Sequence, residues 1–386
     1  MIGFEYYNPA RIVFGEDSEK KLPDLLAQYE VRSLLLVYSG DFIRTLGIYS
    51  VIEDAARNLG IRLLESGNVV PNPSVELVRE LVEQGKKENV DFVLAVGGGS
   101  SIDTAKAVAL GIPYEGDVWD FFDKGISPRR VLPVGVIATT ASSGSETSNA
   151  AIISNGEWKL GFEDDRIIPQ FAVMNPRFTV GLPPYQTFVG IADVLTHLLE
   201  RYFSDERHSD TTDYLIEGAV RALLINADRL LKKSGDVNAR GEVQWLASVA
   251  HNNFLDAGRR ADWASHRIEH ELSAQYNITH GEGMAVTITA WTKYMAEKKP
   301  WRPALLASRV FGADPYDYSE EERAYILSEK LSEFFRKLGL KTTLTELGID
   351  DRDFEVMAKR ATRNGRVGHY LPLDAAEIVE ILNLAR

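Results

Sequence analysis

The sequence predicts an N-terminal α/β nucleotide-binding domain over residues 1–182 and an all-helical C-terminal domain over residues 183–386. A chain of 386 residues is too long for one ordinary hydrophobic core, so two domains are expected. Short β-branched runs alternate with helical periods in the first half, and strand signals nearly vanish after residue 182. The segment Gly181–Pro184, which reads Gly-Leu-Pro-Pro, marks the expected change between the two parts.

The first half alternates strands and helices. The run Phe92–Val96 is wholly apolar, as expected of a parallel strand covered on both faces. Pro71–Ser74 breaks the chain and is expected to start the helix that follows. The predicted strands are 11–14, 33–37, 61–64, 92–96 and 131–138, and the predicted helices are 18–28, 51–59 and 74–88. In the second half, helices are predicted at 189–203, 211–232, 239–256 and 325–338.

Composition and charge exclude several classes of function. With 43 basic and 56 acidic residues the formal net charge is −13, so neither nucleic acid nor an anionic membrane is an expected partner. No apolar run approaches the roughly 18 residues that span a bilayer, and the N-terminus lacks a signal-peptide pattern. We therefore expect a cytoplasmic protein. There is no cysteine, so a metal must be held by histidine and carboxylate side chains.

Two loops predict a nucleotide site. Gly97–Ser101 follows the strand 92–96 directly, and its glycines let the backbone approach a ligand closely. The helix that begins near Ser101 would direct its first N–H groups at a pyrophosphate. A second loop, Thr139–Thr147, is rich in small hydroxyl residues that suit hydrogen bonding to a cofactor. The alternative is a tight strand-to-helix turn that binds nothing. The pattern is neither the P-loop signature nor G-x-G-x-x-G, so those two motifs gain no support.

A histidine and carboxylate pattern predicts a metal site. Asp193 and His197 are four residues apart and would share one face of a helix. His266, His270 and His280 are three of only seven histidines in the chain. Imidazole and carboxylate suit Fe²⁺ or Zn²⁺, and three histidines with one aspartate leave positions for a substrate oxygen. Taken singly, the first pair could be a solvated helix face, and His270 could be a hydrogen-bonded core histidine.

Together these motifs resemble the iron-containing (group III) alcohol dehydrogenases. The similarity extends from Asn8–Gly15 to beyond residue 290, and Asp262–Ala274 resembles the butanol dehydrogenase branch. The motifs that carry it are Gly97–Ser100 with Asp103 and Lys106, Thr139–Thr140 with Gly144–Glu146, Asp193 with His197, and His266, His270 and His280 with Gly281. The segment Arg363–His369 departs from the pattern of the better-known members, which leaves substrate choice the least constrained property.

The resemblance implies a dehydroquinate synthase-like fold, a divalent metal and a nicotinamide cofactor. The implied metal ligands are Asp193, His197, His266 and His280, with His270 in the pocket but outside the ligand set. The implied cofactor residues are Gly40, Asp41, Asn72, Gly97, Gly98, Gly99, Ser100, Asp103, Thr139, Thr140, Lys159 and Leu182. Homodimers are usual among such relatives, so a homodimer is expected here.

The expected activity is transfer of hydride between NAD(P)H and a small aldehyde or primary alcohol of butanol type, with the metal as Lewis acid. His270, or a water it holds, is the candidate for proton delivery. NADP and NAD stay open, because Gly40 suits NADP whereas Asp41 could reach the ribose 2′-hydroxyl of NAD. The alternatives are a glycerol or other polyol dehydrogenase, a dehydroquinate synthase-type lyase that would use Arg259, Arg260 and Arg267, and an inactive binding protein.

Overall fold

The computed structural model describes all 386 residues, and the chain forms two compact units. The α/β unit contains residues 7–182 and 235–252, and the helical unit contains residues 1–6, 183–234 and 253–386. Every named strand lies in the α/β unit, so the predicted fold class is confirmed. The chain passes from the first unit to the second between Leu182 and Pro183, inside the expected Gly-Leu-Pro-Pro segment. Residues 235–252, which the sequence placed in the helical domain, pack with the α/β unit.

A six-stranded sheet forms the centre of the α/β unit, with strand order β1-β8-β5-β4-β2-β3. All neighbouring strands are parallel, and Leu94 of β4 lies between Leu36 of β2 and Gly135 of β5. Since the strands are parallel, their carboxyl ends meet at one edge, where ligands of such sheets bind. The strands are β1 (Arg11–Phe14), β2 (Ser33–Tyr38), β3 (Arg62–Ser66), β4 (Phe92–Gly97), β5 (Val134–Ala138) and β8 (Phe171–Met174).

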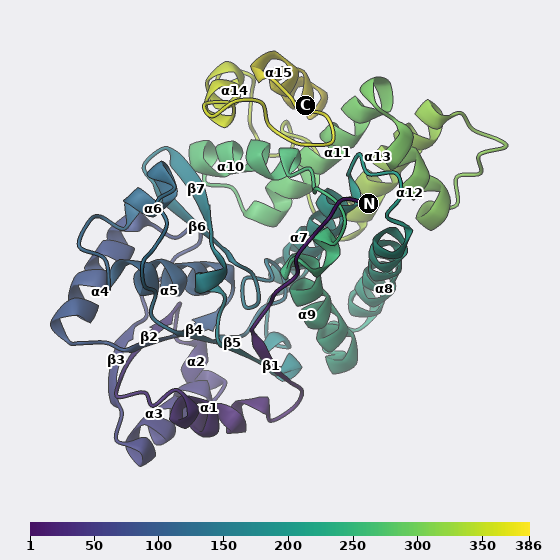
Figure 1. Cartoon of the computed structure of the whole chain (residues 1–386). Helices are drawn as coiled ribbons and strands as arrows, with labels where there is room; N and C mark the ends of the chain where they lie inside the picture. The colour runs from purple at the N-terminus through teal and green to yellow at the C-terminus, as the bar shows by residue number, and fades with distance from the viewer. The chain divides into compact units, whose positions relative to one another are not determined.

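Helices cover both faces of this sheet, which explains why its central strands are apolar throughout. Leu34 and Leu36 point to one face and pack with α1 (Leu22–Gln28) and α3 (Ile48–Leu59). Leu35 and Val37 point to the other face, because side chains alternate along a strand. That face is covered by α4 (Val75–Lys87), α5 (Gly99–Gly111) and α6 (Trp119–Lys124), as Figure 1 shows.

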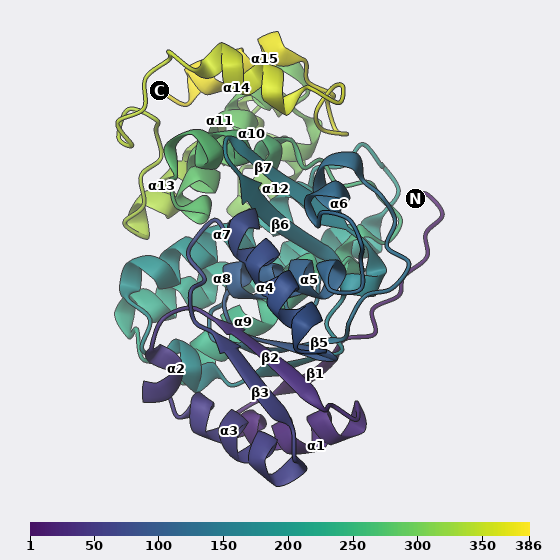
Figure 2. The same cartoon turned by 90° about the vertical axis from the view of Figure 1, so that its left-hand side faces the viewer.

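The sequence did not predict strand β8 or the antiparallel hairpin of β6 (Ala150–Asn155) and β7 (Trp158–Glu163). The hairpin lies beside α5 and α6 in Figure 2. Helix α9 (Val237–His251) ends five residues before the predicted boundary. The short elements are η1 (Ser18–Lys21), α2 (Phe42–Thr45), η2 (Asp165–Ile167) and η3 (Pro176–Thr179).

The second unit is built almost wholly from helices, none long and apolar enough to cross a membrane. Two of them begin with a capping box, in which Ser319 pairs with Glu322 and Asp374 pairs with Glu377. The helices are α7 (Pro184–Tyr202), α8 (Asp210–Lys232), η4 (Phe254–Asp256), α10 (Ala264–Tyr276), α11 (His280–Lys298), α12 (Trp301–Phe311), α13 (Glu320–Lys337), α14 (Phe354–Ala361) and α15 (Ala375–Leu384).

A buried ionic cluster connects several of these helices. The carboxylate of Asp213 on α8 accepts hydrogen bonds from the guanidinium of Arg259 and, at 2.7 Å, from that of Arg302 on α12. Both arginine side chains are 0% exposed and the aspartate is 3% exposed. Charges so far from water are tolerated only when they are paired, so this carboxylate is required by both arginines.

Candidate functional site

Three polar side chains line one face of α7. Asp193, His197 and Glu200 are spaced at i, i+4 and i+7, which places them one above another on a helix. All three are buried. Buried polar groups need hydrogen-bond or metal partners, so this face of α7 indicates a binding site for a metal or a polar ligand. Glu200 was not among the site residues predicted from the sequence, although it follows His197 at helical spacing.

A second face is supplied by α10 and by the turn that follows it. His266, Glu269 and His270 lie within one turn on α10, which ends at Asn277 with a left-handed backbone (φ 50°). The chain reverses there, and His280 is the first residue of α11. The reversal brings the His280 ring within 5.6 Å of the His266 ring and 5.7 Å of the His270 ring, measured between centroids.

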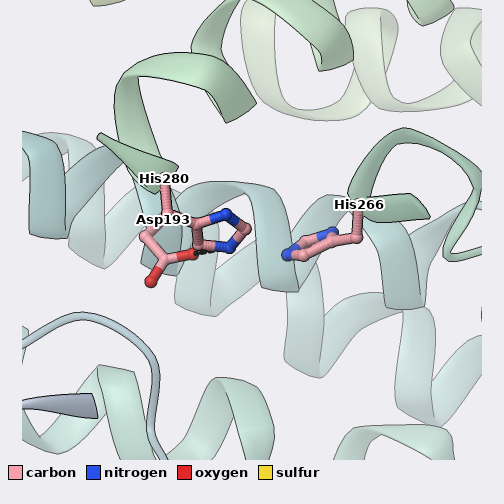
Figure 3. A group of neighbouring side chains, drawn as sticks. All are labelled: Asp193, His266 and His280. Carbon is pink, nitrogen blue, oxygen red and sulfur yellow. Dashed lines mark ion pairs between the residues drawn. The ribbon is translucent and has the colours of Figure 1, made fainter. Parts of the chain in front are cut away.

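The two faces converge on one point. Asp193, His266 and His280 offer ligand atoms that all lie within 4.8 Å of one another, and Figure 3 shows their side chains facing a common space. The Nε2 atom of His280 is 3.6 Å from Oδ1 of Asp193, and Nδ1 of His197 is 3.4 Å from the same oxygen. The ring of His197 also lies 4.7 Å from that of His266. The structure thus brings together all four residues implied as ligands. A second possible group, Glu269 with His270 and His280, adjoins the first.

Two of the histidines have a buried carboxylate next to the ring nitrogen Nδ1. Oε1 of Glu200 lies 3.0 Å from Nδ1 of His266, and Glu269 contacts Nδ1 of His280. An imidazole that donates from Nδ1 keeps its Nε2 lone pair for a metal, so the donor set fits a divalent ion. Burial lowers the pKa of His197 well below its ordinary value, and burial raises the pKa of Glu200 to about 7. Neutral imidazole is the form that binds a metal.

An unusual tryptophan stands before α10. Trp263 has a left-handed backbone (φ 64°), which is uncommon for a bulky residue. Its indole meets the ring of His266 edge-on at 5.0 Å, and the guanidinium of Arg201 lies over it at 4.7 Å. The preceding Asp262 accepts the backbone N–H groups of His369 and Tyr370 at 2.8 and 2.7 Å. Burial, reinforced by the charge of Glu200, raises the pKa of Asp262 to about 8. These hydrogen bonds join the end of the segment Arg363–His369, which departs from the family pattern, to the turn before His266.

In the α/β unit, the glycine turn (Gly97–Ser101) and the hydroxyl loop (Thr139–Thr147) contact each other at the carboxyl ends of β4 and β5. A Cβ atom added to Gly98 would lie 2.5 Å from Oγ1 of Thr140, and one added to Gly99 would lie 2.6 Å from Oγ of Ser143. A side chain at either position would therefore displace the hydroxyl residue that it meets. Gly97 has a left-handed φ of 150°, which requires glycine. Helix α5 begins at Gly99, two residues before the predicted start, so its first N–H groups belong to this turn.

Two buried charged residues of α5, Asp103 and Lys106, form hydrogen bonds with the hydroxyl loop and the residues that follow it. Asp103 accepts a hydrogen bond from the Ser145 hydroxyl at 2.6 Å and from the backbone N–H of Ile152 at 3.1 Å. Lys106 donates to the Ser145 hydroxyl at 3.0 Å and to two backbone carbonyls at 2.8 Å. Burial raises the pKa of Asp103 and lowers that of Lys106 to about 8. Both oxygens of Asp103 thus have protein partners, which supports a role in holding the loop.

The other residues implied for cofactor binding also lie in the α/β unit. Gly40 (φ 67°) and the exposed Asp41 follow β2 and precede α2, and Asn72 (φ 52°) lies in the turn after β3. These turns follow neighbouring parallel strands and so lie at the same sheet edge. Lys159 is buried in β7, and Leu182 is the last residue of the unit's first segment.

Comparison with known protein families gives matches over most of the chain. Residues 9–176 match the family model described as iron-containing alcohol dehydrogenase. Residues 187–385 match the model for the C-terminal part of the Fe-containing alcohol dehydrogenase family. The resemblance drawn from the motifs is therefore confirmed over both units.

Individual relatives match over nearly their full length. The chain is 35% identical over 387 residues to NADH-dependent butanol dehydrogenase A of Clostridium acetobutylicum, covering 99% of each. It is 29% identical over 386 residues to the NADPH-dependent aldehyde reductase YqhD of Escherichia coli, covering 97% of this chain and 98% of that protein. The crystal structure of NADH-dependent butanol dehydrogenase A from Thermotoga maritima superposes with a TM-score of 0.94 at 33% identity, covering 99% of this chain and 98% of the other.

Proposed function

The chain belongs to the iron-containing alcohol dehydrogenase family, and on this premise we propose that it reduces small aldehydes of butanal type at a divalent metal held in its helical unit. It is an oxidoreductase that interconverts alcohols and aldehydes with NAD(P) and a divalent metal as cofactors. The observation that carries the proposal is the convergence of Asp193, His266 and His280, with a buried carboxylate behind each of the two histidines.

We assign the metal to Asp193, His197, His266 and His280. When bound, the ion stabilises negative charge on the substrate oxygen, and the nicotinamide supplies or accepts the hydride. Asp193, His197 and His266 are buried in the helical unit, and the His280 side chain is 28% exposed. Electrostatic interactions among buried groups are stronger than in water.

His270 is our candidate for proton transfer. Its ring lies 5.7 Å from that of His280, and its side chain is buried beside the proposed ligands. We propose that His270, or a water it holds, gives a proton to the substrate oxygen in the direction of aldehyde reduction. His270→Ala should keep its metal but lose turnover, and a variant with full turnover and full metal content would exclude this role.

The cofactor is assigned to the turns at the carboxyl edge of the sheet in the α/β unit. Gly97–Ser100 and the first N–H groups of α5 would hold the pyrophosphate, and Thr139 and Thr140 would contact it from the neighbouring loop. Asn72, Lys159 and Leu182 remain proposed further contacts. At the ribose, Asp41 favours NAD, whereas Gly40 suits NADP.

A polyol dehydrogenase differs from this proposal only in its substrate, so the same site would serve it. A dehydroquinate synthase-type lyase is less well supported, since it needs free basic groups for a phosphorylated substrate. Arg259, one of the three arginines available for that role, is fully buried and already bonded to Asp213.

We further propose that the protein is cytoplasmic, on the basis of its acidic, cysteine-free composition. We also propose that it is a homodimer, because homodimers are usual in the family that it resembles. Sedimentation should give about twice the 43.0 kDa mass of one chain, and a monomer at assay concentrations would contradict the homodimer.

The function is tested by metal analysis followed by a substrate screen. The purified chain is stripped with a chelator, reloaded with Fe²⁺ or Zn²⁺, and assayed with linear aldehydes, primary alcohols and glycerol, each with NADH and NADPH. We expect metal-dependent reduction of small aldehydes. Turnover of glycerol alone would favour the polyol alternative, and no nicotinamide-linked turnover in any metal-loaded form would contradict the proposal.

A further inference from the structure

We propose that Glu200 and Glu269 are positioning residues, which hold His266 and His280 as Nε2 ligands and so set the affinity and geometry of the metal site. The inference rests on the proposed function, because it assumes that these histidines bind the ion. It gives a role to two buried carboxylates that are not among the four proposed metal ligands.

Glu200 links α7 to the start of α10. Its carboxylate accepts the backbone N–H groups of Trp263 and His266 at 2.8 and 3.0 Å, in addition to Nδ1 of His266. The hydroxyl of Ser265 donates to it as well. These are the N–H groups that a helix leaves unsatisfied at its first turn, so one carboxylate both caps α10 and orients the histidine on it.

Glu269 links α10 to α11. It lies one helical turn after His266 and accepts hydrogen bonds from Nδ1 of His280 and from the hydroxyl of Ser273. A Cβ atom on Gly283 would lie 2.8 Å from Oε1 of Glu269, so the absence of a side chain there leaves room for this carboxylate. The ring of His280 is thereby fixed with Nε2 toward Asp193.

Each of these carboxylates has a ring nitrogen of a proposed metal ligand among its partners. Both are 0% exposed, and burying an ionised carboxylate costs several kcal/mol unless its partners compensate. A carboxylate behind a ligating histidine fixes the tautomer and raises the basicity of the ring, and its loss typically weakens metal binding about 10–100-fold. The two histidines that have such a partner come from different helices, so the carboxylates hold both helix segments in register around the site.

The chain provides a matched control on the same helix. Glu271 is also buried, at 8% exposure, but its carboxylate pairs with Arg360 at 2.8 Å rather than with a histidine. Glu271→Gln makes the same chemical change as Glu269→Gln at a neighbouring buried position. A general cost of removing a buried carboxylate would therefore affect both variants alike.

The experiment uses the full chain stripped of metal. Zn²⁺ affinity is measured by competition with a chelator, and Co²⁺ is added separately because its visible absorption reports ligand geometry. We expect about 10–100-fold weaker Zn²⁺ binding and an altered Co²⁺ spectrum for Glu200→Gln and Glu269→Gln, with Glu271→Gln like the wild type. Wild-type affinity and spectrum in both test variants, or an equal loss in the control, would overturn the inference.

His266→Ala separates this inference from the proposed function. If His266→Ala binds Zn²⁺ as tightly as the wild type, the metal assignment itself fails. If His266→Ala loses the metal while the glutamine variants keep it, only the positioning role fails. Should a glutamine variant not fold, Ser265→Ala and Ser273→Ala remove one hydroxyl donor from each carboxylate, and the same two readouts are expected to shift in the same direction.

Discussion

Replacing Gly98 by alanine tests how closely the two nucleotide loops approach each other. Gly98 has a φ of −100°, which alanine adopts readily, so the backbone itself would not be strained. The new methyl group would lie 2.5 Å from Oγ1 and 3.2 Å from Cγ2 of Thr140. Thr140, which we assign to the cofactor, must therefore move away from the turn.

The size of the effect follows from the cost of overpacking. One extra methyl group in a closely packed place typically costs about 1–3 kcal/mol. If cofactor binding requires the two loops in their present arrangement, that cost appears in the binding free energy. Since about 1.4 kcal/mol corresponds to a factor of ten, the Kd for NADH or NADPH should rise roughly 5–150-fold. Metal content should not change.

The assay is a titration of each variant with NADH and NADPH, monitored by cofactor fluorescence. Gly235→Ala in the same unit is the control, because a Cβ atom there would meet nothing within 4 Å. Thr140→Ala removes the atoms that the new methyl group meets, so the double variant should bind more tightly than the two single effects predict. Wild-type cofactor affinity in Gly98→Ala, or strict additivity in the double variant, would refute this reasoning.

Three further predictions concern the ionic groups. Asp213→Asn leaves Arg259 and Arg302 without their shared buried charge, and urea unfolding should show a loss of about 3–5 kcal/mol, whereas a loss under about 1 kcal/mol would contradict the pairing argument. Asp41→Ala should raise the ratio of kcat/KM with NADPH to that with NADH by about tenfold or more, and an unchanged ratio would remove Asp41 from the ribose site. Burial lowers the pKa of Lys106 to about 8 in the folded chain. Between pH 8 and the ordinary pKa of lysine, the unfolded chain therefore binds more protons than the folded chain, and the free energy of unfolding of the wild type rises with pH. Lys106→Met should lose this contribution, up to about 1.4 kcal/mol per pH unit, and identical slopes in the two proteins would contradict the shifted pKa.

The sequence predicted those parts of the fold that local patterns determine. Strands β2 and β4 are apolar runs bounded by turns, and their predicted bounds differ from the structure by one residue at the C-terminal end. Strand β8 is only four residues long, and its place depends on pairing with β1 and β5, which no local pattern reveals. Helix α9 has the same helical period as its neighbours in the sequence. It packs with the α/β unit through long-range contacts, such as the hydrogen bond from Gln244 to Ala138.

The same division applies to the site. Asp193 and His197 alone were ambiguous, and the metal site was predicted from the cluster of His266, His270 and His280 together with the family resemblance. Glu200 lies on the face of α7 that carries Asp193 and His197, and Glu269 lies beside His266 and His270 on α10. Glutamate is common on helices, so neither residue stands out in the sequence. Their hydrogen bonds to histidine form only when α7, α10 and α11 pack together. For Asp103 the cofactor role stays a prediction, since its hydrogen bonds are with the loop beneath that site.

The most direct test of the proposed centre is the position of the metal in a crystal of the metal-loaded chain, located by anomalous scattering at the iron or zinc absorption edge. We expect one peak per chain, about 2.0–2.2 Å from a carboxylate oxygen of Asp193 and from one ring nitrogen each of His197, His266 and His280. A peak bound instead by Glu269, His270 and His280, or no peak in a crystal of protein that reduces aldehydes, would contradict it.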